Sequence, residues 1–268
     1  MSAKATRRGT NVSRQEMSQR NFLNVITDCA DATEFARSRL AFQPDQLQAR
    51  LLDPGLRRGI VCCHRQWGKS TTIAVKAVHR ACCRAGSLTL IVAPSLRQSA
   101  ETVRKAETFA RKLGFRPRGD GDNQVSILFP NGSRIIGLPE SEHTIVGFSA
   151  VSLLVIDEAA RVPDTTYHAL RPMLIQSSGD LWLLSTPLGK RGFFYETWKA
   201  QDPDWTRVHV PITANPRIPP DRVEEERRNL PQSRFNQDYL CEFLQRDDAI
   251  FREDDIQAIF RSDIEPMD

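Results

Sequence analysis

Short runs of apolar residues alternate with longer amphipathic segments along most of this chain. Four apolar runs are continuous rather than alternating, which is typical of buried strands: 59–63, 88–93, 153–156 and 181–185. The segments between and after them have the spacing of helices, at 69–84, 95–113 and 164–176. Buried strands separated by helices form a parallel sheet that is covered on both faces. The pattern therefore predicts an α/β fold.

Further elements extend this pattern at both ends. Residues 21–40 predict one helix, and Pro44 suits the first turn of another. Apolar residues on both sides of Asn131-Gly132 predict a hairpin over 124–138, because Asn-Gly is the strongest short-range hairpin signal. The remaining predicted elements are a helix at 193–200, a strand at 206–210, and helices at 219–230 and 233–244.

Composition favours a soluble globular protein, with 40% hydrophobic and 26% charged residues. No segment approaches the ~18 consecutive apolar residues of a membrane span, so no membrane contact is expected. Residues 1–20 hold five basic residues against one acidic (+4), and residues 247–268 hold eight acidic against two basic (−6). We expect a basic flexible arm at 1–20, one domain at 21–245 and an acidic linker or tail at 246–268. The arm is either a solvated terminus or a contact for DNA phosphates.

The six cysteines lack a metal-binding pattern. No pair has C-x-x-C spacing, and no histidine cluster accompanies them. We expect reduced thiols that act as small buried hydrophobes in a cytosolic protein.

The first candidate for chemistry is HRQWGKST at 64–71, which follows a predicted strand and opens a predicted helix. A helix N-terminus offers unpaired N–H groups and the positive end of its dipole, so this is the context of a phosphate-binding loop. Lys69 is placed to reach the β- and γ-phosphates of a nucleotide, and the Ser70 hydroxyl to ligate Mg²⁺. The usual pattern has glycine at position 63, where this chain has Cys63. The alternative is a chance tripeptide at a helix start.

The second candidate is LLVIDEAA at 153–160, where two carboxylates end a buried strand. Ligands of open α/β sheets bind at the carboxyl edge of the strands. Asp157 is expected to hold Mg²⁺, and Glu158 to polarise the attacking water. The alternative is a helix N-terminus with two favourable acids. The distance along the chain from Lys69 leaves room for an inserted strand and helix.

The third candidate is LLSTPLG at 183–189, another buried strand that ends in small hydroxyls. Ser185 and Thr186 would lie beside the γ-phosphate and respond to its loss. The alternative is a strand end with a Pro-Gly turn.

In this order, the three motifs resemble those of the terminase large subunits that package DNA in tailed viruses. HRQWGKS is similar to that family's deviant phosphate loop, and Phe42-x-Pro44-x-Gln46 to its adenine-reading segment. The resemblance covers about residues 40–245. It implies a RecA-like, additional-strand P-loop ATPase with a mainly parallel central sheet flanked by helices, plus a small helical lid subdomain.

The resemblance also implies roles for single residues. Arg65 would act in cis on the γ-phosphate and join Lys69 and Glu158 as a catalytic residue. Ser185 and Thr186 would couple phosphate loss to motion of the lid. Mg²⁺ would be held by Ser70 and Asp157. The implied nucleotide-binding residues are Gln46, which would read the adenine edge, Arg65, Gln66, Gly68, Lys69, Ser70, Thr71 and Asp157.

The implied function is an ATP-hydrolysing motor that translocates duplex DNA into a procapsid. ATP and Mg²⁺ would be the cofactors, and the partners would be double-stranded DNA, a portal protein and the terminase small subunit. A homo-oligomeric ring on the portal and a location in the host cell cytoplasm follow from the same resemblance. Two alternatives remain: a helicase-like nucleic-acid-dependent ATPase, which would need a second RecA-like lobe, and an inactive truncated prophage remnant.

Two departures from the family pattern stand out. Many relatives have an arginine just before the glycine that aligns with Gly147, where this chain has Val146. If that arginine completes a neighbouring site in the ring, Arg134, Arg161 and Arg171 are the candidate substitutes. The family also normally carries a nuclease domain with clustered carboxylates, and the chain ends too soon after the ATPase motifs to hold one. We therefore do not expect nuclease activity.

Overall fold

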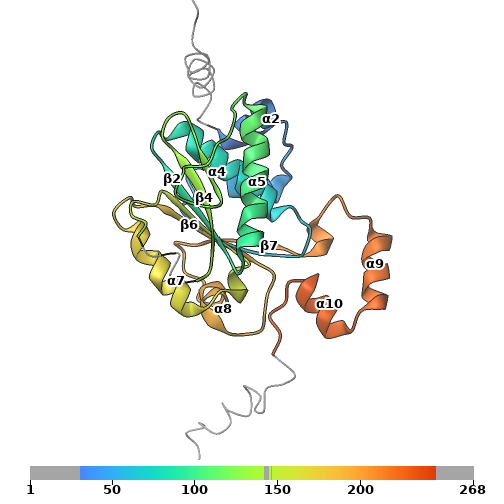
Figure 1. Cartoon of the computed structure of the whole chain (residues 1–268). Coiled ribbons are helices and arrows are strands. Elements are labelled where there is room, and N and C mark those ends of the chain that lie inside the picture. The colour runs from blue at the N-terminus through green and yellow to red at the C-terminus, as the bar shows by residue number, and fades with distance from the viewer. Residues whose placement is uncertain (1–30, 142–144, 146, 246–268) are drawn as a thin grey trace, which may run out of the picture.

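A computed structural model describes residues 31–141, 145 and 147–245. Within these residues, seven strands form one sheet in the order β3-β4-β2-β5-β6-β1-β7 (Figure 1). Every neighbouring pair is parallel except the β3–β4 hairpin, which confirms the predicted sheet and hairpin. The strands are β1 (Arg58–Cys63), β2 (Leu88–Ala93), β3 (Ser126–Leu128), β4 (Arg134–Pro139), β5 (Leu153–Asp157), β6 (Asp180–Ser185) and β7 (Thr206–Val210).

The helices begin and end close to the predicted positions in most cases. α5 begins after Ser95, whose hydroxyl accepts a hydrogen bond from the Gln98 N–H, and it ends just before Gly114 (φ 83°). The α-helices are α2 (Ala32–Leu40), α3 (Gln46–Leu52), α4 (Lys69–Cys83), α5 (Leu96–Lys112), α7 (Asp164–Leu170), α8 (Gly192–Lys199), α9 (Pro220–Asn229) and α10 (Gln232–Asp238). Short 3₁₀ segments are η1 (Ala159–Arg161), η2 (Arg171–Leu174) and η3 (Ile212–Ala214).

Three predicted helix boundaries are wrong. α3 is capped by Asp45, so Pro44 precedes the helix instead of lying in its first turn. α7 ends at Leu170 and continues as η2, because Pro172 has no N–H for the α-helical ladder. α10 ends at Asp238 rather than near 244, and Cys241 (φ 62°) then turns the chain back to the sheet.

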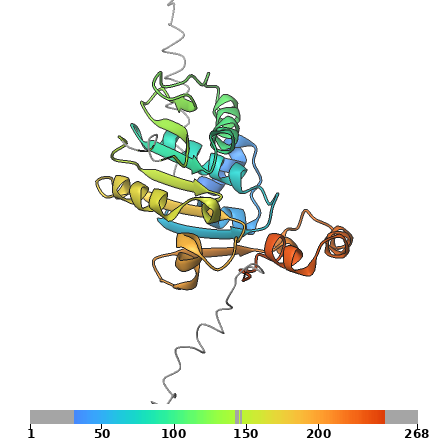
Figure 2. The same cartoon turned by 60° about the horizontal axis from the view of Figure 1, so that its bottom comes forward.

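Helices cover both faces of the sheet (Figure 2). One apolar cluster joins α2, α3, α4 and α5 to one face, and a second joins α7 and α8 to the other. Successive strand residues point to opposite faces, so β1 contributes Val61 to the first cluster and Ile60 and Cys62 to the second. This two-sided burial explains why β1, β2, β5 and β6 have continuous apolar sequences.

A third, small cluster lies apart from the sheet. Ile212, Val223 and Phe235 are its buried members, and Ile218 and Tyr239 pack against them. α9 and α10, which supply much of this cluster, project to one side of the sheet in both views (Figures 1 and 2). They form a small helical subdomain, called the lid below, as predicted.

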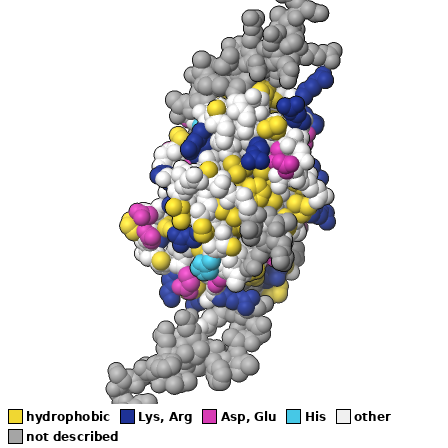
Figure 3. All heavy atoms as spheres, turned by 60° about the vertical axis from the view of Figure 1, so that its left-hand side comes forward, with side chains coloured by type: hydrophobic (Ala, Val, Ile, Leu, Met, Phe, Trp, Pro, Cys, Tyr) yellow, Lys and Arg dark blue, Asp and Glu magenta, His cyan; other side chains and the backbone are white. Residues whose placement is uncertain are grey.

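The surface mixes side chains of different kinds. Figure 3 shows one face, on which hydrophobic side chains adjoin separate basic and acidic ones. Within the described part of the chain, no helix combines the length and apolar character that crossing a bilayer requires.

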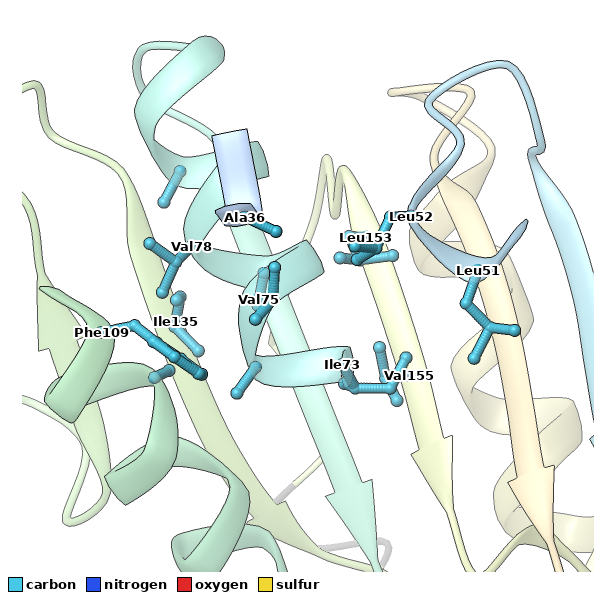
Figure 4. Packing of buried hydrophobic residues seen from close by; sticks show 14 of the residues in the cluster. Ala36, Leu51, Leu52, Ile73, Val75, Val78, Phe109, Ile135, Leu153 and Val155 are labelled. Atoms are coloured by element: carbon cyan, nitrogen blue, oxygen red, sulfur yellow. The ribbon is translucent and has the colours of Figure 1, made fainter. Parts of the chain in front are cut away.

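The packing of α4 fixes where its first turn lies. Ile73 of α4 lies toward Val155 of β5, and Leu52 of α3 toward Leu153 (Figure 4). All four side chains are at most 2% exposed. Burying such a side chain contributes ~1.5–3 kcal/mol, so α4 is held firmly over the strands. Its N-terminus is therefore held at one edge of the sheet.

The cysteines agree with the sequence-based expectation in part. Cys62, Cys63, Cys82 and Cys241 are free and buried. Burial raises the pKa of the Cys63 thiol to about 12, which keeps it protonated. Cys83 is disulfide-bonded, so the prediction of reduced thiols is wrong for this residue. The sequence does not reveal such a bond, because the bond requires the fold to bring two cysteines together, with Cα atoms within about 7 Å of each other. Cys29 lies outside the described residues.

Candidate nucleotide-binding site

Three neighbouring strands bring the sequence motifs to one edge of the sheet. β6 lies between β1 and β5. The segment 64–71 follows β1, Asp157 ends β5, and Ser185 ends β6. In the register of the sheet, Ser185 lies opposite Cys62 of β1, and Leu184 opposite Asp157. The carboxyl ends of parallel strands share an edge, so the three motifs are adjacent.

Lys69 lies between the two carboxylates at the end of β5. Its Nζ is 3.1 Å from Asp157 Oδ1 and also forms an ion pair with Glu158. The side chains are 17%, 10% and 19% exposed for Lys69, Asp157 and Glu158, so solvent screens these pairs only partly. Burial alone lowers the pKa of Lys69, but the carboxylates of Asp157 and Glu158 outweigh it and raise this pKa above its ordinary value. The ammonium therefore keeps its charge at neutral pH.

Ser70 and Asp157 form an oxygen pair beside this ammonium. The Ser70 hydroxyl donates a hydrogen bond of 3.3 Å to Asp157 Oδ2. Mg²⁺ at nucleotide sites is bound by one or two carboxylates together with phosphate oxygens and water. One carboxylate and one hydroxyl at the start of a helix fit that requirement, so these two residues could hold Mg²⁺.

Glu158 is held in an uncommon backbone conformation. Its φ of 55° and ψ of 40° lie in the left-handed region, which few residues other than glycine adopt. Arg161, in η1, donates from Nη1 to Glu158 Oε2 at 2.7 Å. Each carboxylate oxygen of Glu158 thus has one cation, Lys69 or Arg161. Backbone strain of this kind concentrates at functional sites.

The loop before α4 turns through two left-handed residues, Gln66 (φ 66°) and Gly68 (φ 98°). Glycine suits position 68 because of this angle and because a Cβ there would lie 3.1 Å from Gln48 Nε2. Trp67 between them is 1% exposed, and its indole donates to Asp45 Oδ2 at 3.1 Å. The Trp67 carbonyl accepts from Gln48 Nε2 (3.1 Å) and Arg217 Nη2 (2.6 Å).

A capping box anchors Gln48 against this loop. The Gln48 N–H donates to Asp45 Oδ1 at 2.8 Å, and the Asp45 N–H donates to Gln48 Oε1 at 3.0 Å. Both polar atoms of the Gln48 side chain therefore form hydrogen bonds: Oε1 accepts from the Asp45 N–H, and Nε2 donates to the Trp67 carbonyl. Gln46, the predicted adenine reader, is exposed at the start of α3. Its role stays a prediction.

Arg65 points toward the lid. Its Nη2 lies 4.0 Å from Asp238 Oδ2 of α10, and its side chain is 57% exposed. The preceding residue, His64, is buried, and its Nε2 lies 3.2 Å from Asn215 Nδ2. The predicted action of Arg65 on a γ-phosphate stays a prediction.

The remaining predicted residues lie close to these groups in the fold. Ser185 and Thr186 are buried, and the Ser185 hydroxyl donates to the Thr186 carbonyl at 2.7 Å. Thr71 is half-buried in the first turn of α4, and Gln66 is exposed on the loop. The coupling role of Ser185 and Thr186 stays a prediction. A cavity of about 300 Å³ lies elsewhere, between α5 and segment 117–127, and none of the predicted residues lines it.

Known proteins identify the family to which these motifs belong. The profile described as "Terminase large subunit, T4likevirus-type, N-terminal" matches residues 64–258. The chain belongs to the terminase large subunit family. The terminase large subunit of Thermus virus P23-45 is 25% identical over 250 residues, which cover 79% of this chain and 51% of that protein. The corresponding protein of Escherichia phage T5 is 28% identical over 210 residues, covering 75% and 47%. The chain therefore spans about half the length of the curated relatives it matches.

Solved terminases share the fold. The large terminase ATPase domain of Thermus phage P74-26 superposes with a TM-score of 0.69 at 22% identity, covering 80% of this chain and 99% of that one. The large terminase of bacteriophage HK97 gives 0.65 at 18% identity, covering 81% and 55%. The large terminase of a thermophilic bacteriophage in complex with ADP gives 0.62 at 15% identity, covering 74% and 53%. These similarities confirm the predicted RecA-like fold.

In the terminase pattern, an arginine just before the aligned glycine is a candidate to complete the site of a neighbouring subunit. Val146 lies outside the described residues. Of the three candidate substitutes, Arg161 is bonded to Glu158 of its own chain. Arg134 lies 3.6 Å from Asp120 Oδ2. Arg171 is exposed, with its guanidinium 5.7 Å from the centre of the Tyr167 ring. Their action on a neighbour stays a prediction.

Three residues that contact the phosphate-binding loop were not predicted from the sequence: Gln48, Asn215 and Arg217. The pattern Asp45-x-x-Gln48 is a capping-box signature, so this contact was detectable. Asn215 and Arg217 follow a strand far along the chain and have no local signal. Only the fold brings them to the loop, across 151 and 150 positions.

Proposed function

We propose that this terminase-family chain hydrolyses ATP with Mg²⁺ and drives duplex DNA into a procapsid. The observation that carries the proposal is the meeting of Lys69, Ser70, Asp157 and Glu158 at one edge of the sheet, beside a helix N-terminus. A cation, a hydroxyl and two carboxylates in this arrangement are the parts that phosphoryl transfer from a nucleotide requires.

Different residues of the site are proposed to bind the phosphates, to bind the metal and to accept the proton. The N-terminus of α4 and the Lys69 ammonium bind the phosphates and stabilise the charge that develops on them. Ser70 and Asp157 would hold Mg²⁺, which would neutralise charge on the phosphate oxygens. Glu158 orients the attacking water and accepts its proton.

The ion pairs of Lys69 suggest how binding prepares the site. In this structure the ammonium contacts both carboxylates. Nucleotide phosphates compete for the same ammonium, and they release Glu158 from one of its two cations. The Glu158 oxygen that the ammonium leaves is then free to accept the proton of the attacking water.

The proposed partners are double-stranded DNA, a portal protein and the terminase small subunit, with a homo-oligomeric ring assembled on the portal in the host cell cytoplasm. Support comes from membership of the terminase large subunit family and from relatives that bear this name. The large terminase of the thermophilic bacteriophage, which has this fold, has been solved with ADP and with ATP-gamma-S. No observation favours a helicase-like ATPase over this function. Because the chain spans about half the length of its curated relatives, the absence of nuclease activity stays a prediction.

The decisive experiment compares ATP hydrolysis by the purified chain with that of Lys69→Ala. We expect the variant to lose turnover by about a hundredfold or more, because one main stabiliser of the phosphate charge is gone. Lys199→Ala, an exposed lysine at the end of α8, is the matched control and should hydrolyse ATP like the wild type. Equal turnover of wild type and Lys69→Ala would reject the assignment.

Packaging needs separate tests. DNA binding through phosphates predicts that the logarithm of the binding constant falls linearly with the logarithm of salt concentration. An affinity independent of salt would contradict such contacts. We also expect a portal protein to stimulate ATP hydrolysis, and no stimulation would argue for a different nucleic-acid ATPase.

A further inference from the structure

The lid contacts the phosphate-binding loop through the segment that joins it to the sheet. This segment runs from η3 to α9, and Asn215 and Arg217 lie within it. Asn215 is 4% exposed and pairs with His64, the first residue of the loop. The Asn215 side-chain oxygen also accepts from the Arg217 N–H at 3.1 Å. Ile218, the next residue, packs in the lid cluster. Arg217 therefore lies between the lid core and the loop.

Arg217 shares its target with a residue of the fixed core. Both Arg217 Nη2 and Gln48 Nε2 donate to the Trp67 carbonyl, at 2.6 and 3.1 Å. Gln48 belongs to α3, which is packed against α4 on the sheet, whereas Arg217 belongs to the lid side. Arg217 is also 3.3 Å from Asp45 Oδ2, the oxygen that accepts from the Trp67 indole. Asp45 thus holds the guanidinium in place.

The Trp67 carbonyl belongs to the same peptide group as the Gly68 N–H. A peptide group is planar, and in the trans form its C=O and N–H point in opposite directions. The described residues contain no cis peptide bond. Donors that fix the Trp67 oxygen on one side therefore fix the direction of the Gly68 N–H on the other. Gly68 precedes Lys69 at the start of α4, where N–H groups bind phosphate.

We propose that Arg217 is a positioning residue that couples the lid to the nucleotide site by orienting the Trp67–Gly68 peptide. The inference rests on the proposed nucleotide binding. When the lid is in the position seen here, Arg217 and Gln48 together hold this peptide for phosphate binding. When the lid moves away, only Gln48 remains. Energetic coupling is reciprocal, so bound nucleotide must in turn stabilise the lid.

The test uses the full chain with Mg·ADP as the probe, and Arg217→Ala, Arg217→Lys and Arg222→Ala as variants. Arg222 is the matched control because it is an exposed arginine of the same lid, paired only with Glu225 on α9 among the contacts of the described residues. Two quantities are measured: the dissociation constant of Mg·ADP, and amide hydrogen exchange of residues 220–238 with and without saturating nucleotide. Saturation separates the response of the lid from any loss of affinity.

We expect Arg217→Ala to bind Mg·ADP about tenfold more weakly, as is usual for a lost charged hydrogen bond. In the wild type and in Arg222→Ala, saturating Mg·ADP should slow exchange in the lid by about fivefold or more, at the low end of common coupling. In Arg217→Ala this slowing should vanish. Arg217→Lys keeps the positive charge on a single donor nitrogen but loses the planar fork, so its affinity and its slowing of exchange should fall between those of the wild type and Arg217→Ala.

The outcomes separate the inference from the function. If the wild type binds Mg·ADP and Arg217→Ala shows the same affinity and the same slowing in the lid, the inference is overturned and the function stands. If Arg217→Ala loses affinity but keeps the slowing, Arg217 holds the loop without coupling the lid, which also overturns the inference. If the wild type itself binds no nucleotide, the proposed function and the inference both fail.

Discussion

Ser70 and Asp157 are 87 positions apart in the chain, and the Ser70 hydroxyl donates a hydrogen bond of 3.3 Å to the Asp157 carboxylate. The contact joins the start of α4 to the end of β5, two strands away from β1 in the sheet. It places two Mg²⁺-type ligands next to the Lys69 ammonium. The contact requires β1 and β5 to end on the same edge, because both are parallel to β6, and to lie close together, because only β6 separates them.

This contact predicts a graded response at position 70. Ser70→Thr keeps a hydroxyl and should keep ATP turnover, whereas Ser70→Ala removes the hydroxyl proposed to bind Mg²⁺ and should raise the Mg²⁺ concentration needed for half-maximal turnover. Chelation of Mg²⁺ should abolish turnover in every variant. Turnover measured over a Mg²⁺ titration is the readout. An identical Mg²⁺ requirement in Ser70→Ala and the wild type would contradict a role of this hydroxyl at the metal.

Arg161 is predicted to support catalysis within its own chain. Loss of its 2.7 Å bond to Glu158 leaves the Glu158 carboxylate free to move away from its position. We expect Arg161→Ala to lower ATP turnover by about ten- to a hundredfold, the usual effect of a misplaced catalytic group, with little change in nucleotide affinity. Arg104→Ala, an exposed arginine paired with Glu101, is the control and should leave both unchanged.

A mixing experiment distinguishes this role from action on a neighbour. If Arg161 acted in trans, subunits with Lys69→Ala would supply the missing arginine to Arg161→Ala subunits and restore turnover. We expect no restoration, because Arg161 is bonded to Glu158 of its own chain. Restored turnover in the mixture would contradict the role in cis.

The site was predictable where short-range patterns coincide with the topology. A run of apolar residues that ends in Asp157 and Glu158 identifies both a buried strand and its functional edge. Gly68, Lys69 and Ser70 identify a helix start in the same way. Because carboxyl ends of parallel strands share an edge, these two signals predict that both groups lie at one edge of the sheet. The strand order, which places β1 and β5 on either side of β6, then brings them into contact.

Features that depend on specific long-range contacts were not predictable. The turn at Cys241, which ends the predicted last helix early, is accompanied by a contact of its thiol with the Val210 carbonyl of β7. The role of Arg217 at the loop depends on where the lid lies, and no periodicity encodes that. The disulfide of Cys83 likewise depends on proximity in space.

Lys76 predicts a pH dependence of stability. The residue is 3% exposed, and its ammonium donates to the Leu51 and Asp53 carbonyls, at 2.7 and 3.2 Å, at the end of α3. Burial lowers its pKa from the ordinary 10.5 to about 8, although Asp180 opposes the shift. Between these values the unfolded chain binds more protons than the folded one, so this residue makes the protein more stable as pH rises from about 8 to about 10.5.

Comparison with Lys76→Met isolates this effect from the cysteines, whose raised pKa values act in the opposite direction at high pH. We expect the unfolding free energy of the wild type minus that of Lys76→Met to rise by up to ~1.4 kcal/mol per pH unit within the window. Denaturant unfolding at several pH values measures this difference. Lys105→Met is the control, and its unfolding free energy should change with pH as that of the wild type does. Parallel pH curves for the wild type and Lys76→Met would show that Lys76 does not titrate in this range.

The most direct measurement of the central claim is ATP binding and turnover in Glu158→Gln, with Glu224→Gln on exposed α9 as the control. The amide keeps the shape of the side chain and leaves Lys69, Ser70 and Asp157 in place, but it cannot accept a proton. We predict that Glu158→Gln binds Mg·ATP at least as tightly as the wild type and hydrolyses it about a hundredfold more slowly or worse. Hydrolysis by Glu158→Gln at the wild-type rate would contradict the account.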